Sequence, residues 1–226
     1  MADPLWEPGL IVREGGADNE LTVILLHGLG ADMEDLAGIA EAMEGCRGVR
    51  WLFPNAPVRS VTLNGGARMR AWYDIYGFGG AAGEDGDGLA AMAGALGVLL
   101  AAERARSAGP IVLGGFSQGG AMALYTALHA REPVAGVLAL SAYLPRKDLL
   151  PAAAADSPAI FMAHGTFDPI IPLDLARHGF GLLEARGYRG LWREYAMGHT
   201  IIGEELADAE RFLWATRAAG RHGEGT

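Results

Sequence analysis

The chain has 226 residues, of which half are apolar and a fifth are charged, and its formal net charge at pH 7 is −9. This length predicts one domain over residues 1–226 with a sizeable core. The negative charge and a single lysine argue against nucleic-acid binding, which needs clustered cations. The only cysteine, Cys46, excludes an intrachain disulfide and a cysteine-rich metal site.

The first residues include acids and two prolines but no basic segment followed by an apolar one. We therefore expect no export signal and a cytoplasmic protein. The most apolar segment, residues 89–102, has about 14 residues, whereas a helix that crosses a bilayer needs ~20. We expect a buried helix there and no integral membrane segment.

After an irregular lead-in over residues 1–9, the first half of the chain predicts strands, a helix and a long excursion. Leu21–Leu26 is a continuous β-branched and apolar run, which is typical of a parallel strand buried on both faces. Asp32 is a suitable cap for a helix that reaches about Met43. Residues 58–88 lack periodicity but contain several aromatics, which favours a partly ordered excursion near the functional site. Two further strands are expected at 10–13 and 49–53.

In the second half, strands and helices alternate regularly. Asp87 is a suitable cap for a helix that ends before Gly109-Pro110, and residues 220–226 are expected to be a disordered tail. This alternation predicts an α/β fold, with helices on both faces of a mainly parallel central sheet and sites at the carboxyl ends of its strands. A strand, a tight turn and a helix are expected within 111–130. Further strands are expected at 134–140, 159–163 and 191–195, and further helices at 173–186 and 204–217.

Gly115-Phe-Ser-Gln-Gly119 lies between a strand pattern and a helix pattern. A serine on such a turn has its hydroxyl lifted clear of the sheet, and the glycines leave room for close contact between strand and helix. The following helix directs free N–H groups and the positive end of its dipole at the serine. The pattern predicts that Ser117 is a nucleophile.

An acid and a base follow in the order Ser, Asp, His that this architecture requires. Asp168 comes directly after the expected strand at 159–163 and is anchored by Pro169, and His199 follows the last strand. His199 would take the serine proton, and Asp168 would fix the tautomer of the imidazole. Asp148 follows an earlier strand and is the alternative acid.

Other polar residues near strand ends have competing interpretations. His27 and His164 would break the order Ser, Asp, His, and we expect their rings to hold adjacent loops by hydrogen bonds. Asp74 precedes the serine and is expected to have a structural role in the excursion. A tetrahedral oxyanion needs N–H donors, which we expect from Gln118 and from the loop after the first buried strand, with Leu29 as the best candidate.

Several motifs along the chain resemble one known family. Together they resemble the phospholipase/carboxylesterase family of α/β-hydrolases, which includes acyl-protein thioesterases and small bacterial carboxylesterases. The resemblance covers residues 21–214, and the chain departs from it most between Gly77 and Asp87, beside the expected acyl groove. The motifs are His27-Gly-Leu-Gly-Ala31, Phe53-Pro-Asn-Ala-Pro57, Trp72-Tyr-Asp74, Gly115-Phe-Ser-Gln-Gly-Gly-Ala-Met-Ala123, His164-Gly-Thr-Phe-Asp-Pro-Ile-Ile-Pro172 and Gly198-His-Thr200.

The resemblance implies an α/β-hydrolase fold without a large cap domain. It also implies a triad, two backbone oxyanion donors and an acyl-binding groove. The positions that match are Ser117, Asp168 and His199 for the triad, Leu29 and Gln118 for the donors, and Ile75, Tyr143 and Ile170 for the groove.

The predicted function is a serine hydrolase that cleaves carboxylic esters with short to medium acyl chains, with thioesters as further candidate substrates. It would form an acyl-enzyme on Ser117 and need no metal or cofactor. The expected partner is a small ester or acylated substrate, and an apolar patch around the site would permit a homodimer. The alternatives are an acyl-protein thioesterase, a lysophospholipase and, from another class, a ligand-binding α/β-hydrolase without turnover. A binding protein gains nothing from keeping all three triad residues, which argues against the last.

Overall fold

The structure is a computed structural model that describes residues 9–16, 19–43, 46, 48–77 and 83–222. Most of the expected irregular lead-in and the last four residues of the expected tail lie outside these ranges. Residues 220–222 continue the last helix, so the expectation of a disordered tail is wrong for them.

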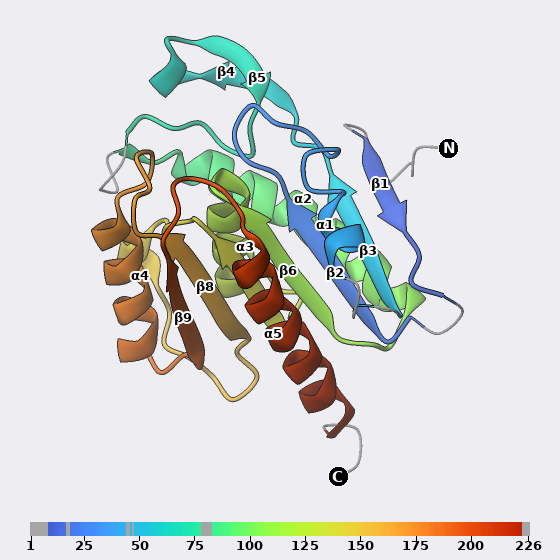
Figure 1. The fold of residues 1–226 in the computed structure, drawn as a ribbon. Helices are drawn as coiled ribbons and strands as arrows, with labels where there is room; N and C mark the ends of the chain where they lie inside the picture. Colours follow the sequence, from blue (N-terminus) through green and yellow to red (C-terminus); the bar gives the residue numbers. More distant parts are fainter. Residues whose placement is uncertain (1–8, 17–18, 44–45, 47, 78–82, 223–226) are drawn as a thin grey trace.

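Seven strands form the central sheet in the order β1-β3-β2-β6-β7-β8-β9 (Figure 1). The edge strand β1 is antiparallel to β3, and every other neighbouring pair is parallel. The prediction of a mainly parallel sheet is therefore confirmed. The strands are β1 (Leu10–Arg13), β2 (Leu21–Leu26), β3 (Val49–Pro54), β6 (Ile111–Phe116), β7 (Gly136–Leu140), β8 (Ala159–Gly165) and β9 (Gly190–Tyr195).

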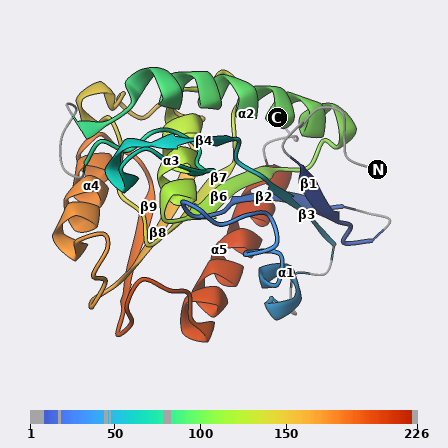
Figure 2. The same ribbon diagram turned by 90° about the horizontal axis from the view of Figure 1, so that it is seen from above.

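Helices cover both faces of the sheet (Figure 2). One face packs against α2, α3 and α4 through a cluster that includes Leu96, Met122 and Leu183. The other face packs against α1 and α5 through a cluster that includes Ile39 and Leu213. The described part of the chain contains no large cap domain. The helices are α1 (Ile39–Ala42), α2 (Gly86–Arg106), α3 (Gln118–His129), α4 (Leu173–Ala185) and α5 (Gly203–His222).

The helix expected between Asp32 and Met43 is only four residues long. At its expected start, Asp32 Oδ1 accepts the N–H of Glu34 at 2.9 Å and Asn55 Oδ1 accepts the N–H of Met33 at 2.8 Å. Both bonds satisfy N–H groups that have no partner at the start of a helix, so they are compatible with a helix as well as with turns. Residues 33–38 form turns, and only Ile39–Ala42 is helical.

The excursion at residues 58–88 contains a two-stranded hairpin that projects beyond the sheet (Figure 1). Its strands β4 (Val58–Val61) and β5 (Ala67–Arg70) are joined by the 3-10 turn η1 (Thr62–Asn64) and two glycines with positive φ. Asp74 accepts hydrogen bonds from the N–H and the hydroxyl of Thr62 at 2.7 and 2.6 Å. The structural role of Asp74 is confirmed, but the expected irregular segment is partly a hairpin.

Helix α2 begins earlier than the sequence predicts and has 21 residues. Asp85, rather than Asp87, caps it by accepting the N–H of Gly88 at 2.8 Å. Within the described ranges α2 is the one helix long and apolar enough to cross a membrane, because it extends beyond the apolar segment 89–102 at both ends. It packs against α3 and buries Leu89 and Leu96, as a core helix does.

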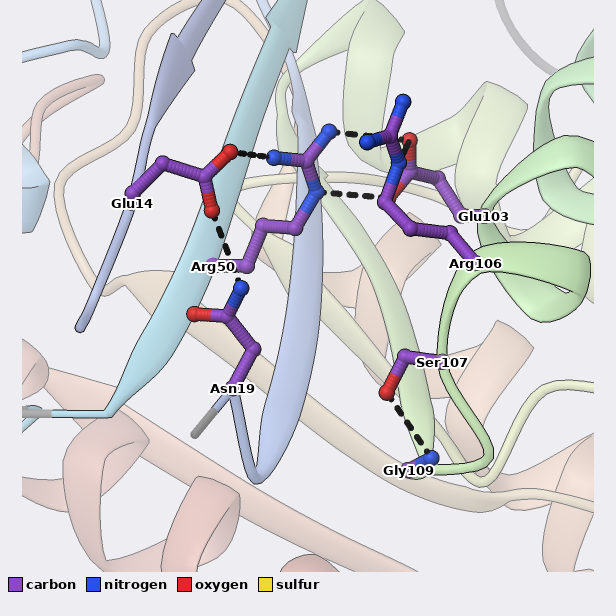
Figure 3. Close-up of polar contacts among 7 residues, drawn as sticks. All are labelled: Glu14, Asn19, Arg50, Glu103, Arg106, Ser107 and Gly109. Atoms are coloured by element: carbon purple, nitrogen blue, oxygen red, sulfur yellow. Dashed lines mark hydrogen bonds and ion pairs between the residues drawn. The ribbon is translucent and has the colours of Figure 1, made fainter. Parts of the chain in front are cut away.

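A buried ion pair joins β3 to α2 near the amino-terminal ends of the parallel strands (Figure 3). Arg50 donates from Nε to one carboxylate oxygen of Glu103 at 2.7 Å and from Nη2 to the other at 3.1 Å. Both side chains are 3% exposed. Glu14 pairs with Nη1 of Arg50 and accepts the side-chain amide of Asn19, and Arg106 lies 3.6 Å from Glu103. The network therefore ties together three segments that are distant in the sequence.

Glu205 is a second buried acid, in the first turn of α5. Its side chain is 0% exposed, and neither carboxyl oxygen has a hydrogen-bond partner in the described part of the chain. Burial raises the pKa of Glu205 to about 8, against a smaller lowering by the backbone of Ile202. The folded chain therefore keeps a proton on Glu205 at neutral pH.

We expect Glu205 to make the chain less stable as the pH rises from about 4.5 to about 8. In this range the folded state holds a proton that the unfolded state has released, so the free energy of unfolding falls. Glu205→Gln should remove this slope and raise the stability at pH 8 by up to about 5 kcal/mol, at ~1.4 kcal/mol per pKa unit. Thermal unfolding at pH 5 and pH 8 measures the effect, and Glu204→Gln, at the exposed neighbour, is the matched control. Equal pH slopes for wild type and Glu205→Gln would contradict the prediction.

Candidate active site

Ser117 lies on a sharp turn between β6 and α3. Its φ of 56° and ψ of −119° place it in a conformation that residues other than glycine adopt rarely. A Cβ atom on Gly115 would lie 2.5 Å from the backbone of Gly119, and one on Gly119 would lie 1.9 Å from the carbonyl oxygen of Leu26. Only glycine at both positions allows α3 to begin this close to β2 and β6.

Ser117, His199 and Asp168 form a hydrogen-bonded line at the carboxyl ends of β6, β9 and β8. His199 Nε2 lies 2.9 Å from Ser117 Oγ, and His199 Nδ1 lies 2.7 Å from Asp168 Oδ2. A carboxylate can only accept, so the imidazole proton is assigned to Nδ1 and the lone pair of Nε2 faces the serine hydroxyl. The His199 ring also packs on Phe116, with 4.7 Å between ring centroids. This geometry allows His199 to take the proton of Ser117.

Three donors hold the carboxylate of Asp168. Besides His199, the backbone N–H groups of Ile170 and Ile171 donate to Oδ1 at 2.8 and 2.9 Å. Burial acts to raise the pKa of Asp168, but the hydrogen bonds outweigh it and leave the pKa below its ordinary value. Asp168 is therefore ionised at neutral pH although its side chain is 0% exposed.

The alternative acid, Asp148, has a different partner. It lies in the 3-10 turn η3 (Lys147–Leu149), and both of its carboxylate oxygens accept from Arg146, at 3.0 and 2.8 Å. The structure therefore places Asp168, and not Asp148, on the imidazole of His199. Among the described residues, no group of three or more His, Cys, Asp or Glu side chains could hold a metal ion.

The rings of His27 and His164 hold neighbouring loops, as expected. His27 Nε2 accepts the N–H of Ala56 at 3.0 Å, and its Nδ1 lies 2.7 Å from the carbonyl oxygen of Gly28. His164 Nε2 lies 2.9 Å from the carbonyl oxygen of Ile171, in the loop that carries Asp168. Burial lowers the pKa of both imidazoles, so both rings are neutral at pH 7.

The loop after β2 lies against the serine turn. A Cβ atom on Gly28 would lie 3.7 Å from Cβ of Ser117, and Leu29 and Gln118 line the same cavity as Ser117. Within the described ranges, the N–H groups of Leu29 and Gln118 donate to no backbone carbonyl. Gln118 is the first residue of α3, where N–H groups lack intrahelical partners. Both residues therefore line the cavity, and neither N–H group is used by a backbone hydrogen bond of the described residues.

A cavity of about 500 Å³ opens over Ser117 and His199, which is within the usual range for small-molecule sites. All three positions expected in the acyl groove lie on its wall, together with two residues of the hairpin turn. This turn was not predicted, although Asn64-Gly-Gly66 is a turn signal of the kind found in hairpins. These five residues are Ile75, Tyr143, Ile170, Leu63 and Asn64.

Tyr143 is held in a single position at this wall. Its hydroxyl lies 2.9 Å from the hydroxyl of Tyr73, and the two side chains are 3% and 0% exposed. Burial raises the pKa of both phenols, so the pair is neutral. The cavity therefore gains an aromatic wall without an added charge.

The comparison with known proteins agrees with this geometry. The phospholipase/carboxylesterase family matches residues 8–217. The chain belongs to this family. A curated relative named acyl-protein thioesterase 1, from Debaryomyces hansenii, is 35% identical over 222 residues and covers 91% of this chain and 95% of its own. A relative of the same name from Neurospora crassa is 36% identical over an alignment of 232 residues, which covers 94% of this chain and 93% of its own.

Solved structures support the same family. The crystal structure of acyl-protein thioesterase 2 from Zea mays has a TM-score of 0.83 at 26% identity, over 92% of this chain and 98% of that one. The carboxylesterase from Bacillus cereus has a TM-score of 0.76 at 22% identity, over 92% of this chain and 94% of its own, which is evidence of a shared fold alone. The α/β-hydrolase fold is therefore confirmed. As a member of the phospholipase/carboxylesterase family, the chain is a serine hydrolase of ester bonds.

Proposed function

We propose that Ser117, His199 and Asp168 are the catalytic triad of a carboxylesterase. The observation that carries the proposal is the continuous hydrogen-bonded path from Ser117 Oγ through the imidazole to Asp168, with steps of 2.9 and 2.7 Å. The path begins in a cavity large enough for a small ester. A serine hydroxyl is a weak nucleophile by itself, and an adjacent oriented base activates it.

In the proposed reaction, Ser117 Oγ attacks the carbonyl carbon of the ester while His199 Nε2 takes the hydroxyl proton. The carbonyl oxygen becomes an oxyanion, which the N–H groups of Leu29 and Gln118 stabilise. His199 then gives its proton to the leaving alcohol oxygen as the C–O bond breaks, and the acyl group remains on Ser117. A water molecule then attacks this acyl-enzyme while His199 Nε2 takes one of its protons. His199 returns this proton to Ser117 Oγ as the bond between the acyl carbon and Oγ breaks, and the carboxylic acid leaves.

The acyl chain would bind along the apolar wall of the cavity. Ile75, Tyr143 and Ile170 line it with branched and aromatic side chains, which suit an apolar chain better than a charged substrate. We propose that the substrates are carboxylic esters with short to medium acyl chains. Thioesters fit the same chemistry, because a thiolate is a better leaving group than an alkoxide.

A second candidate function is acyl-protein thioesterase activity. It is favoured by the names of the curated relatives, which match more than nine-tenths of this chain at 35% and 36% identity. Lysophospholipase activity is a further alternative and uses the same triad on a lipid ester. A non-catalytic ligand-binding role is not supported, because the family is one of hydrolases.

A fluorophosphonate probe, followed by peptide mass spectrometry, tests the triad. We expect the label on Ser117 of the wild-type chain and none on Ser117→Ala, since the probe reacts with an activated serine and stays attached to it. Labelling that survives Ser117→Ala, or that never occurs, would overturn the proposed mechanism. Rates on p-nitrophenyl esters of increasing chain length, set against an acyl thioester of matched length, then distinguish the carboxylesterase from the thioesterase.

We also propose a single domain over residues 1–226 and a cytoplasmic location. A homodimer is a further proposal, supported by exposed apolar side chains close to the cavity and the Asp168 loop. Leu63, Phe167 and Ile170 are 46%, 72% and 52% exposed. The molar mass from light scattering decides between monomer and dimer.

A further inference from the structure

A buried set of hydrogen bonds joins the two loops that carry the proposed oxyanion donors. The indole N–H of Trp72 donates to the carbonyl oxygen of His27 at 2.8 Å, in the loop that leads to Leu29. The side-chain amide of Gln118 donates to the carbonyl oxygen of Tyr73 at 2.8 Å and accepts the N–H of Trp72 at 3.1 Å. Residues 72–73 are therefore bonded to both loops at once.

These bonds lie in the interior. Trp72 and Tyr73 are 0% exposed and Gln118 is 2% exposed, so water does not compete for the same donors and acceptors. The rings of Trp72 and His27 also pack together, with 5.2 Å between centroids. The amide of Gln118 uses both its oxygen and its nitrogen, so the side chain has one orientation.

We infer that Trp72 is a positioning residue for the oxyanion hole. This inference rests on the proposed function, in which Leu29 and Gln118 supply the oxyanion donors. Trp72 does not line the cavity. It acts through two hydrogen bonds, to His27 and Gln118, which together with the bond from Gln118 to Tyr73 set the separation between the loop after β2 and the start of α3.

The separation matters because two N–H groups stabilise an oxyanion only when both reach it at about 2.7–3.1 Å. A donor that moves by a fraction of an ångström still permits substrate binding, but it stabilises the transition state less. Loss of the Trp72 bond to His27 should therefore lower kcat and leave KM almost unchanged. A side chain that only fills the core would instead change stability without this kinetic pattern.

The test compares Trp72→Phe with Trp51→Phe. Trp51 is also buried, at 3% exposure, but it lies in β3 on the opposite face of the sheet and stacks on Phe53. For Trp72→Phe we expect kcat to fall about 10- to 100-fold with KM unchanged, and the affinity for an alkyl trifluoromethyl ketone to fall by the same factor. This ketone adds to the serine and forms a tetrahedral oxyanion. Trp51→Phe should lose stability but keep both values.

Gln118→Met is the second variant and removes both amide bonds at similar side-chain length. It should show the same loss of kcat and of ketone affinity, so it decides the matter if Trp72→Phe does not fold. The double variant should lose no more than about the larger single loss, because both changes release the same segment. Values of kcat within about twofold of wild type for either variant, or additive losses, would overturn the inference. Fluorophosphonate labelling of Ser117 would persist in that case, so the proposed function would stand.

Discussion

Alanine at Ser117 is expected to lower kcat on a p-nitrophenyl ester by about 10⁴- to 10⁶-fold, with little change in KM or Tm. The hydroxyl oxygen is the atom that forms the acyl-enzyme, so no neighbouring group replaces it. His199→Ala should cost a similar factor, because Ser117 keeps its proton without the base. The double variant should be no slower than the worse single variant, since the two residues act as one unit.

Ser141→Ala is the matched control for this experiment. Ser141 also follows a strand of the sheet, is 0% exposed and has a positive φ of 47°. Its hydroxyl has no hydrogen-bond partner in the part of the chain that the structure describes, and it is not placed on the triad. Its replacement should leave kcat unchanged. A loss below about 10³-fold in Ser117→Ala or His199→Ala would contradict the triad.

Removal of Glu103 is expected to cost about 3–5 kcal/mol of unfolding free energy. Glu103→Ala leaves the guanidinium of Arg50 buried at 3% exposure with only Glu14 as an acid partner. A buried charge without its paired carboxylate is strongly destabilising. Urea unfolding monitored by circular dichroism measures the change, and activity should persist at low temperature because the ion pair lies at the far end of the sheet from Ser117.

Two further variants separate the charge effect from packing. Arg106→Ala removes a partner that is 56% exposed, and it should cost less than about 1 kcal/mol. Arg50→Met combined with Glu103→Leu removes both charges and should recover most of the stability lost in Glu103→Ala. A cost of less than about 1 kcal/mol for Glu103→Ala would show that the pair contributes little.

The sequence was sufficient to predict which loops meet at the site. Ser117, Asp168 and His199 each follow a strand expected from the sequence, and the carboxyl ends of parallel strands lie at one edge of a sheet. The structure brings the three side chains within hydrogen-bond distance of one another there. The order of elements along the chain carried this prediction, and no precise local geometry was needed.

Interactions between segments that are far apart along the chain could not be predicted from the sequence. Where a helix was expected from Asp32, the chain forms turns, and the N–H of Met33 donates to Asn55, which is 22 residues away. The backbone N–H of Trp72 donates to the side chain of Gln118, which is 46 residues away. Such pairs leave no periodic pattern, because periodicity reports only which face of one element is buried.

The sequence contains one indication of the buried ion pair that could have been used to predict it. Arg50 lies within a segment that otherwise reads as a fully buried strand, and a charge there requires a partner. The partner could not be named, because the position of Glu103 on α2 depends on how that helix crosses the sheet. The hairpin was missed for a different reason: Arg59, Arg68 and Arg70 dilute the apolar alternation of its strands.

The backbone contacts around Gly115 and Gly119 divide the site into a fixed part and an adjustable part. No side chain can be introduced at either glycine without displacing Leu26 or α3. Substitutions at these glycines therefore cannot be used to reposition Ser117. Leu63, Ile75 and Ile170, by contrast, come from the hairpin turn, the segment after the hairpin and the loop after β8, and all three line the cavity. Ile170 holds Asp168 through its backbone N–H, which any residue except proline would keep. Libraries that aim to change the accepted acyl group should therefore vary these three positions and leave the strand ends untouched.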